Sequence, residues 1–300
     1  MIKTLSYSIT ELLPYINWIY FFYAWGLPPW CAKTIEESAE KEIKHPIDEK
    51  ERIQANSARS LYADVLRLAS TLDAKYSVFA RFGLFEAWSE DDNIVISHSA
   101  KTKIRIPFLR QQIVHKDDIP HLCWADFIEP YGAEGPHRLG LFISCVQQEM
   151  ETLYQDDEYM HMLVQTFSDR LAEAAAEKMH EAVRKTYWGY APNENFGAQE
   201  LFAERYIGRR PAIGYPSLPD QSLMFLLDEV LDCSAIGMQL TSNGMMIPHS
   251  SVAGLMFSHP ACSHFSIGKI DEEQLQDYSH RRGIPVEEMR KFLAANLMYK

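Results

Sequence analysis

Three groups of residues in this chain have types and spacings that could bind a ligand. The first is an acidic row, Asp169, Glu173 and Glu177, in which each carboxylate follows the last by four residues. Residues four apart share one face of a helix, and like charges there destabilise it by roughly 0.2–0.5 kcal/mol per pair. The row is therefore either a solvated helix face, which the pattern alone favours, or a site for a positively charged ligand.

The second group is the segment RPAIGYP (210–216). Pro211 favours an extended backbone at Arg210. Gly214 and Pro216 indicate a tight, non-helical path beyond it. Extended backbone leaves amide and carbonyl groups free to hold a ligand, and an arginine can bind a carboxylate through two parallel hydrogen bonds. A purely structural loop is the plainer interpretation of the same residues.

The third group is aromatic. Residues 12–30, LLPYINWIYFFYAWGLPPW, surround Asn17 with rings that would either line a cleft for a flat ligand or fill the core, and core packing is the commoner role. No membrane span is predicted here, because Pro14 and Pro28 bracket only 13 residues. A bilayer needs about 20 apolar residues.

Familiar catalytic motifs are absent from the sequence. The chain has no glycine-rich phosphate loop and no GxSxG elbow, and HEAVR (180–184) begins like the zinc-protease motif HExxH but ends in arginine. The eleven histidines form no cluster with the spacing of metal ligands. We therefore predict neither a metal site nor a catalytic side chain.

The composition argues against a nucleic-acid partner and indicates the cellular compartment of the protein. The 300 residues carry 29 basic and 41 acidic side chains, a formal net charge of −12. This charge repels the phosphate backbone, so no nucleic-acid partner is expected. The five cysteines are odd in number and scattered, with no CxxC pair and no preceding secretory signal. They are expected to be buried or inert thiols of a cytoplasmic protein.

Hydrophobic periodicity predicts both helices and strands. Helices are expected at 33–45, 48–72 (with Asp48 as N-cap), 150–186 and 285–297, and strands at 78–88, 93–97, 102–106, 140–146, 255–259 and 265–270. The two kinds of element do not alternate as βαβ units. The predicted fold class is therefore α+β.

Six stretches of the chain together resemble one family closely. They are YINWIYFF (15–22), WADFIEP (124–130), EAVRKTYWGYAPNEN (181–195), RYIGRRPAIGYPSLPD (205–220), VAGLMFSHP (252–260) and DYSHRRGIPVEEMRKFLAANLMY (277–299). The family is the S-adenosylmethionine-binding reactivation domain of cobalamin-dependent methionine synthase. The resemblance covers nearly the whole chain and is weakest at about 30–75. WGYAPNEN and RPAxGYP are its most specific strings.

The resemblance implies a C-shaped α+β single domain over residues 1–300, with a central twisted antiparallel β-sheet flanked by helices. Its expected parts are a mainly helical part (1–75), a sheet and hairpin part (76–146), and a part with the long helix, the RPAxGYP loop and the C-terminal elements (147–300). S-adenosylmethionine would lie in a shallow groove.

The chemistry of the family implies the function. Cob(I)alamin occasionally oxidises to inactive cob(II)alamin, a flavodoxin or another reductase returns one electron, and the methyl group of S-adenosylmethionine then traps the reduced cobalamin. The domain holds the methyl donor over a corrin that the cobalamin-binding chain of the synthase supplies, so its contribution is positioning. Because the chain has no room for the other modules, we expect an accessory protein that reactivates a methionine synthase in trans.

Residues at positions that match the motifs of the family are expected to have the roles that they have in the family. The expected cofactor-binding set is Asn17, Glu173, Arg210, Pro211, Ala212, Gly214, Tyr215, His264 and Phe265. Arg210 would bind the methionine carboxylate, Glu173 would contact the ligand, and the backbone of 211–214 would hold the adenosyl part. Towards the partner, Tyr215 would lie near the corrin. Asp169 would meet the histidine ligand that the cobalamin domain releases.

Three departures from the family pattern raise a second hypothesis. Asn17 replaces the aspartate that binds the ligand's ammonium group, which exchanges a charge-assisted hydrogen bond for one about 1 kcal/mol weaker. His264-Phe265 replaces a Tyr-Phe pair, and QSLM (221–224) replaces His-Thr-Glu-Lys. The alternative function is a docking or regulatory protein for a corrinoid methyltransferase that has lost S-adenosylmethionine binding. Activation of some other corrinoid methyltransferase is a third hypothesis.

Overall fold

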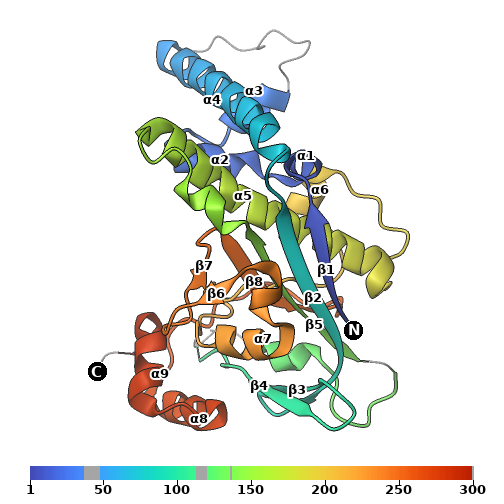
Figure 1. Ribbon diagram of the computed structural model, residues 1–300. Helices are drawn as coiled ribbons and strands as arrows, with labels where there is room; N and C mark the ends of the chain where they lie inside the picture. Colours follow the sequence, from blue (N-terminus) through green and yellow to red (C-terminus); the bar gives the residue numbers. More distant parts are fainter. Residues whose placement is uncertain (37–47, 113–119, 136, 299–300) are drawn as a thin grey trace.

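The computed structural model describes residues 1–36, 48–112, 120–135 and 137–298. Their centre is a six-stranded antiparallel sheet, and helices pack against both of its faces (Figure 1). The predicted α+β class with a central antiparallel sheet is therefore confirmed.

The sheet is built around one long strand. Its members are β1 (Ile2–Tyr7), β2 (Val78–Glu90), β3 (Asn93–Ser97), β4 (Lys103–Pro107), β5 (Arg138–Val146) and β8 (Ser251–Met256). The order is β4-β3-β2-β5-β8, and β1 also pairs with β2. Along one edge, β2 pairs with β1 through Val78–Gly83 and with β3 through Ala87–Glu90. The strands predicted between 78 and 146 are confirmed to within two residues.

Side chains of the central strands alternate between two hydrophobic cores, as the pleat of a strand requires. Phe142 of β5 packs in the core beneath α4 (Glu49–Asp73) and α5 (Glu158–Ala182), whereas Ile143 faces the core beneath α7 (Leu223–Leu231). Burial on both faces explains why β5 reads as an unbroken apolar run.

The N-terminal helices largely follow the predictions. α4 begins after Asp48, whose carboxylate accepts a hydrogen bond from the backbone N–H of Glu51 at 2.7 Å, so the predicted N-cap is confirmed. Of the helix predicted at 33–45, the structure shows α3 (Cys31–Glu36), and 37–47 lie outside the described residues.

The prediction of one helix over 150–186 is wrong at its start. Gln148–Thr152 form a separate 3₁₀ turn, and Tyr154 adopts a positive φ of 57°. A residue with a left-handed backbone cannot continue an α-helix. α5 therefore begins only at Glu158, where the side chain of Asp157 caps it.

The aromatic segment folds back into the protein as short helices. Its helices are α1 (Ile9–Leu12) and α2 (Trp18–Ala24). Elsewhere in the chain, the short elements α6 (Ala198–Phe202), β6 (Gln239–Leu240) and β7 (Met246–Ile247) connect the larger ones. Phe21 and Phe22 of α2 are completely buried, which agrees with the core interpretation. Within the described parts of the chain, no helix has the length and apolar character needed to cross a membrane.

The strand predicted at 265–270 is not formed. The Ile267 N–H donates to the Pro216 carbonyl (2.9 Å), and the Ile270 carbonyl accepts from Met298 (3.0 Å). These hydrogen bonds run to different parts of the chain, so they satisfy the backbone without building a ladder.

The C-terminal helices differ from the predictions in extent. The helix predicted at 285–297 is confirmed only as α9 (Val286–Phe292), and α8 (Glu272–Arg282) was not predicted. α8 escapes detection because Leu275 and Tyr278 are the only large apolar side chains that it buries. Both helices lie at the end of the molecule opposite α4 (Figure 1). The strand predicted at 255–259 begins earlier, as β8.

The segment RPAIGYP, which sequence analysis singles out, runs along the edge of β8 that does not pair with β5. The Leu255 N–H donates to the Pro211 carbonyl and the Ile213 N–H donates to the Ala253 carbonyl, both at 2.9 Å. Between them, Gly254 lies against the loop so closely that a Cβ there would be 2.1 Å from the Pro211 oxygen. The close approach of loop and strand therefore requires glycine.

Gly254→Ala should separate this loop from β8. Because the added methyl group would overlap the Pro211 oxygen, we expect the free energy of unfolding to fall by about 2 kcal/mol, measured by urea denaturation. Gly197→Ala is the control, since the nearest atom to its Cβ would lie 3.8 Å away. Equal unfolding midpoints for the two variants would show that the loop is not held against β8.

Candidate ligand-binding site

One cavity of about 650 Å³ lies where α2, α5 and two loops meet. Among the residues singled out from the sequence, those that line it are Asn17, Glu173, Arg210, Pro211, Ala212, Tyr215, His264 and Phe265. Gly214 and Asp169 are not among the lining residues. The fold thus brings four separate stretches of the chain to one cavity, whose volume is typical of a small-molecule site.

The three carboxylates of the acidic row have three different surroundings. Glu177 is 8% exposed and lies in the cavity wall. Glu173 accepts a hydrogen bond from the Tyr215 hydroxyl at 3.4 Å. Asp169, one turn earlier on α5, accepts one from Ser250 Oγ at 2.7 Å. The row is therefore not simply a solvated helix face, because two of its three members belong to the cavity.

Arg210 places a largely buried cation in the cavity wall, with 12% of its side chain exposed. Its Nη2 donates to Glu177 Oε2 at 3.1 Å, and its guanidinium lies 5.3 Å from the centre of the Phe142 ring. Burial disfavours the charge, but Glu177 and Glu173 raise the pKa of Arg210 overall, so the group stays a cation. Its Nε is buried and has no hydrogen-bond partner among the described residues. Leaving such an N–H unpaired costs about 1–3 kcal/mol, which an acceptor on a ligand would recover.

A second buried guanidinium lies next to Glu177. Arg184 is completely buried, 3.8 Å from Glu177, and donates two hydrogen bonds to Glu194 at 2.6 and 2.8 Å. Its Nη1 donates to His180 Nδ1 at 2.8 Å, so that ring nitrogen is an acceptor. Burial, together with Arg184, holds the pKa of His180 well below its usual range. HEAVR is therefore an internal polar cluster and not a variant zinc motif.

The backbone of the RPAIGYP loop is fixed at several points. Trp124 Nε1 donates to the Ser217 carbonyl at 2.8 Å, and the Ile267 N–H donates to the Pro216 carbonyl at 2.9 Å. Gly214 has a φ of +88° and closes the turn of the loop. Glycine adopts this φ without strain. Together with the bonds to β8, these contacts hold the loop in an extended, non-helical path.

The loop is also tied to α8 through Asp220, which is 1% exposed. Its carboxylate accepts hydrogen bonds from the Tyr278 hydroxyl (2.7 Å), Ser222 Oγ (2.8 Å) and Arg282 Nε (3.3 Å). Tyr278 and Arg282 belong to the DYSHRRG stretch. That stretch therefore acts as a support for the cavity loop.

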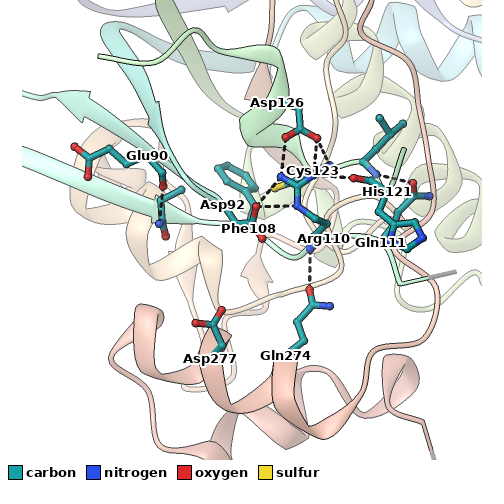
Figure 2. Close-up of polar contacts among 12 residues, drawn as sticks. Glu90, Asp92, Phe108, Arg110, Gln111, His121, Cys123, Asp126, Gln274 and Asp277 are labelled. Atoms are coloured by element: carbon teal, nitrogen blue, oxygen red, sulfur yellow. Dashed lines mark hydrogen bonds and ion pairs between the residues drawn. The ribbon is translucent and has the colours of Figure 1, made fainter. Parts of the chain in front are cut away.

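Figure 2 shows how the same helix is fastened to the far end of the sheet. Arg110 lies between Asp92 and Asp126, with N–O distances of 2.6 and 2.7 Å. Hydrogen bonds from Arg110 to Asp126 and Asp92 raise the pKa of its guanidinium. The backbone N–H of Arg110 donates to Gln274 of α8 at 2.7 Å. Arg110 thus joins α8 to the β2–β3 turn and to Asp126 of the WADFIEP stretch.

Two cavity residues that depart from the family pattern have partners within the protein. Asn17 Oδ1 accepts from the Ile19 N–H at 3.1 Å and caps α2. His264 Nε2 lies 3.1 Å from Glu204 Oε1. Burial alone would raise the pKa of Glu204, but His264 and Arg209 lower it overall. The Glu204 carboxylate is therefore charged at the edge of the cavity.

Sequence analysis missed several lining residues, notably Arg170 and Glu204, and included Tyr20 only as part of the aromatic group. Arg170 could have been found, because it precedes Glu173 by three residues and so shares its helix face. Glu204 carries no such signal: it follows the short helix α6 and has a positive φ of 50°, which no local motif predicts. Among the described residues, no group of three or more His, Cys, Asp or Glu side chains is placed to hold a metal ion.

Comparison with known proteins identifies one family. The family model described as "Vitamin B12 dependent methionine synthase, activation domain" matches residues 8–283. The solved structure of the MetH reactivation domain bound to AdoHcy is similar to this chain, with a TM-score of 0.88 and 34% sequence identity. The match covers 100% of this chain and 91% of the other.

Glu194→Gln tests the buried charge cluster. The variant leaves the Arg184 guanidinium buried without its closest counter-charge, so we expect the free energy of unfolding to fall by about 3 kcal/mol in urea denaturation. Glu200→Gln is the matched control, because Glu200 is 42% exposed and lies 3.9 Å from Arg205. An exposed pair of this kind contributes about 0–1 kcal/mol. If the free energy of unfolding falls as little as in the control, the buried charge cluster does not stabilise the fold.

Proposed function

The chain belongs to the activation-domain family of vitamin B12-dependent methionine synthase, and from this premise we propose that it binds S-adenosylmethionine and supports reductive methylation of cobalamin on a partner protein. The observation that carries the proposal is Arg210, a buried cation in the cavity wall whose Nε lacks an acceptor among the described residues. A carboxylate is the acceptor that matches a guanidinium, because it accepts two parallel hydrogen bonds.

The charges around the cavity fit the rest of such a ligand. Its lining holds three carboxylates, Glu173, Glu177 and Glu204, against two guanidinium groups, Arg170 and Arg210. S-adenosylmethionine combines one carboxylate with an ammonium and a sulfonium group, so it is a net cation. A lining with an excess of carboxylates favours a ligand of that charge.

The protein would hold the methyl donor and contribute little else. S-adenosylmethionine supplies the methyl group when bound. In this proposal Arg210 anchors its carboxylate, and the fixed backbone of 211–214 with Phe265 holds the adenosyl part. Such anchoring holds the methyl donor in the orientation that methyl transfer needs. This is a catalytic contribution that requires no acid–base chemistry.

The cobalamin would come from a partner. Tyr215 lines the cavity and is 55% exposed, so it can meet a corrin that approaches the opening. The Asp169 side chain is 37% exposed and can meet the histidine that the cobalamin domain releases. We propose that this partner is the cobalamin-binding chain of a methionine synthase reactivated in trans, with a flavodoxin or another reductase as electron donor. All five cysteines are free and buried, which supports a reducing, cytoplasmic setting for this reaction.

A docking or regulatory protein without S-adenosylmethionine is the second candidate. Asn17 favours it, because its amide oxygen already caps α2 and its NH₂ group cannot accept a hydrogen bond from an ammonium group. His264 favours it too, since it pairs with Glu204 and reduces the negative charge open to a ligand when it is protonated. Activation of another corrinoid methyltransferase would use the same chemistry with a different partner.

Arg210→Ala should abolish most of the ligand affinity. Removing a buried, charge-assisted carboxylate contact should weaken binding of S-adenosylmethionine about 10- to 100-fold in calorimetric titration. Arg205→Ala, whose side chain is 67% exposed, is the control and should bind normally. The same two variants are then compared for reactivation of a cob(II)alamin-loaded synthase that lacks this domain. Equal binding by both would contradict the assigned anchor, and no binding by the unaltered chain would favour the second candidate.

Asn17→Asp with His264→Tyr separates the two candidates. In a working site the paired change should alter the dissociation constant only a few-fold, because one neutral hydrogen bond of about 1 kcal/mol becomes charge-assisted. If the unaltered chain binds nothing and the double variant binds tightly, the site has been abandoned. Calorimetric titration of both proteins with S-adenosylmethionine measures the difference.

A further inference from the structure

A second cavity, of about 410 Å³, lies where β4, α7, α8 and α9 meet. Figure 1 shows these elements in its lower half, away from α2 and α4. None of the residues that line this cavity also lines the first one. Its volume falls within the range of small-molecule sites. We call this second cavity the α7–α9 pocket.

Much of the wall of the α7–α9 pocket is apolar. Phe225 and Leu226 come from α7, Phe292 comes from α9, and Ile284 lies between α8 and α9. Leu226 belongs to the second hydrophobic core, whereas Ile284 and Phe292 pack against the smaller cluster of α8 and α9. Phe225 remains 40% exposed. The pocket therefore leaves apolar surface open between two cores, where an apolar group of a ligand can be buried.

Three guanidinium groups line the α7–α9 pocket, those of Arg105, Arg281 and Arg282. Arg281 is fixed, because its Nη1 and Nη2 each donate to a backbone carbonyl at 3.1 Å. Arg282 donates from Nε to Asp220 at 3.3 Å and from Nη2 to Ser222 Oγ at 3.0 Å. Its Nη1 has no hydrogen-bond partner among the described residues, although only 7% of the side chain is exposed. An acceptor on a ligand would satisfy this donor.

Two carboxylates, Glu229 of α7 and Glu288 of α9, line the same pocket. Both residues are exposed, and neither side chain forms an ion pair within the described parts of the chain. The open donor of Arg282 is therefore buried, whereas the open carboxylates are accessible to solvent. A wall of this kind can pair a carboxylate in its interior and an ammonium group nearer to solvent.

We propose that the α7–α9 pocket binds an α-amino acid with an apolar side chain. The carboxylate of the ligand accepts a hydrogen bond from Arg282 Nη1, and its ammonium group meets Glu229 or Glu288. Its side chain packs against Phe225 and Phe292. A simple anion would leave the two carboxylates without a partner, and a purely apolar ligand would leave the Arg282 donor buried and unpaired. The proposal does not depend on the proposed function, because the two cavities share no lining residue.

The first experiment titrates the purified chain with L-methionine, L-leucine and L-phenylalanine, followed by saturation-transfer difference NMR and calorimetry. At least one should bind saturably, with a dissociation constant in the millimolar range or below. The amide of that amino acid lacks the carboxylate and should bind about tenfold more weakly. Its N-acetyl derivative lacks the ammonium group and should bind about fivefold more weakly. Arg210→Ala, which alters the first cavity, should bind the amino acid normally.

Phe225→Ala and Glu229→Gln locate the site. Phe225→Ala should weaken binding of the amino acid about tenfold, because it removes apolar surface from the wall. Glu229→Gln should weaken it about fivefold and leave the N-acetyl derivative unaffected, since that compound offers no ammonium group. Glu273→Gln is the matched control for charge, because Glu273 is an exposed residue of α8 that does not line the pocket. An unchanged midpoint of urea unfolding shows that each variant is folded.

Three results would overturn the proposal. The first is that the unaltered chain binds none of the three amino acids saturably. The second is that the amide or the N-acetyl derivative binds as tightly as the amino acid. The third is that Arg210→Ala abolishes binding while Phe225→Ala and Glu229→Gln retain it, which would place the amino acid in the first cavity. If S-adenosylmethionine does not bind but the amino acid does, and its binding depends on Phe225 and Glu229, the proposed function fails and the α7–α9 pocket stands.

Discussion

Four charged groups are buried together beside the cavity, and none of them would be tolerated there alone. Arg184 and Arg210 are held by Glu194 and Glu177, and Glu177 lies between the two guanidinium groups at 3.1 and 3.8 Å. Removing one member of such a set leaves an uncompensated charge in a poorly solvated interior. The positions of α5, the WGYAPNEN stretch and the RPAIGYP loop are coupled for this reason, since each contributes at least one of the charges.

The position of the loop that carries Arg210 depends on hydrogen bonds to the sheet as much as on the ion pair with Glu177. It runs along the free edge of β8 with single bridges to Phe257 and Gly254, and so behaves like a short additional strand. An edge strand offers unpaired backbone groups on its outer side. Trp124 and Asp220 then fix the far half of the loop from the second hydrophobic core and from α8. α8, which does not line the cavity, is thereby linked to the loop that does.

This construction fits the proposed function, in which the protein holds a reactive group for a partner. Much of the cavity wall is fixed by the ion pair between Arg210 and Glu177 and by the backbone bonds of the RPAIGYP loop, so little reorganisation is needed when a ligand enters. Its opening lies between exposed side chains of α2 and the Tyr215 loop, where a large partner has room to approach.

Local patterns in the sequence determined most elements. The runs of branched and aromatic residues in β2 and β5, the apolar stripe of α5 and the N-cap at Asp48 all depend on residues close in the chain, so these elements could be predicted. The family strings likewise contain nine of the 18 residues that line the cavity. Arg170 was within reach of the same reasoning, because it lies on the helix face of Glu173.

Only the tertiary structure decided which of those residues contact one another. That Glu177 is paired with Arg210 and that His264 meets Glu204 depend on residues 33 and 60 positions apart in the chain. Long-range contacts likewise explain the failed strand at 265–270 and the unpredicted α8, which is held by hydrogen bonds to Asp220 and Arg110 and packs Leu275 and Tyr278 into a hydrophobic cluster. A chain specifies its local periodicity directly, but it specifies long-range partners only through the packing of the whole fold.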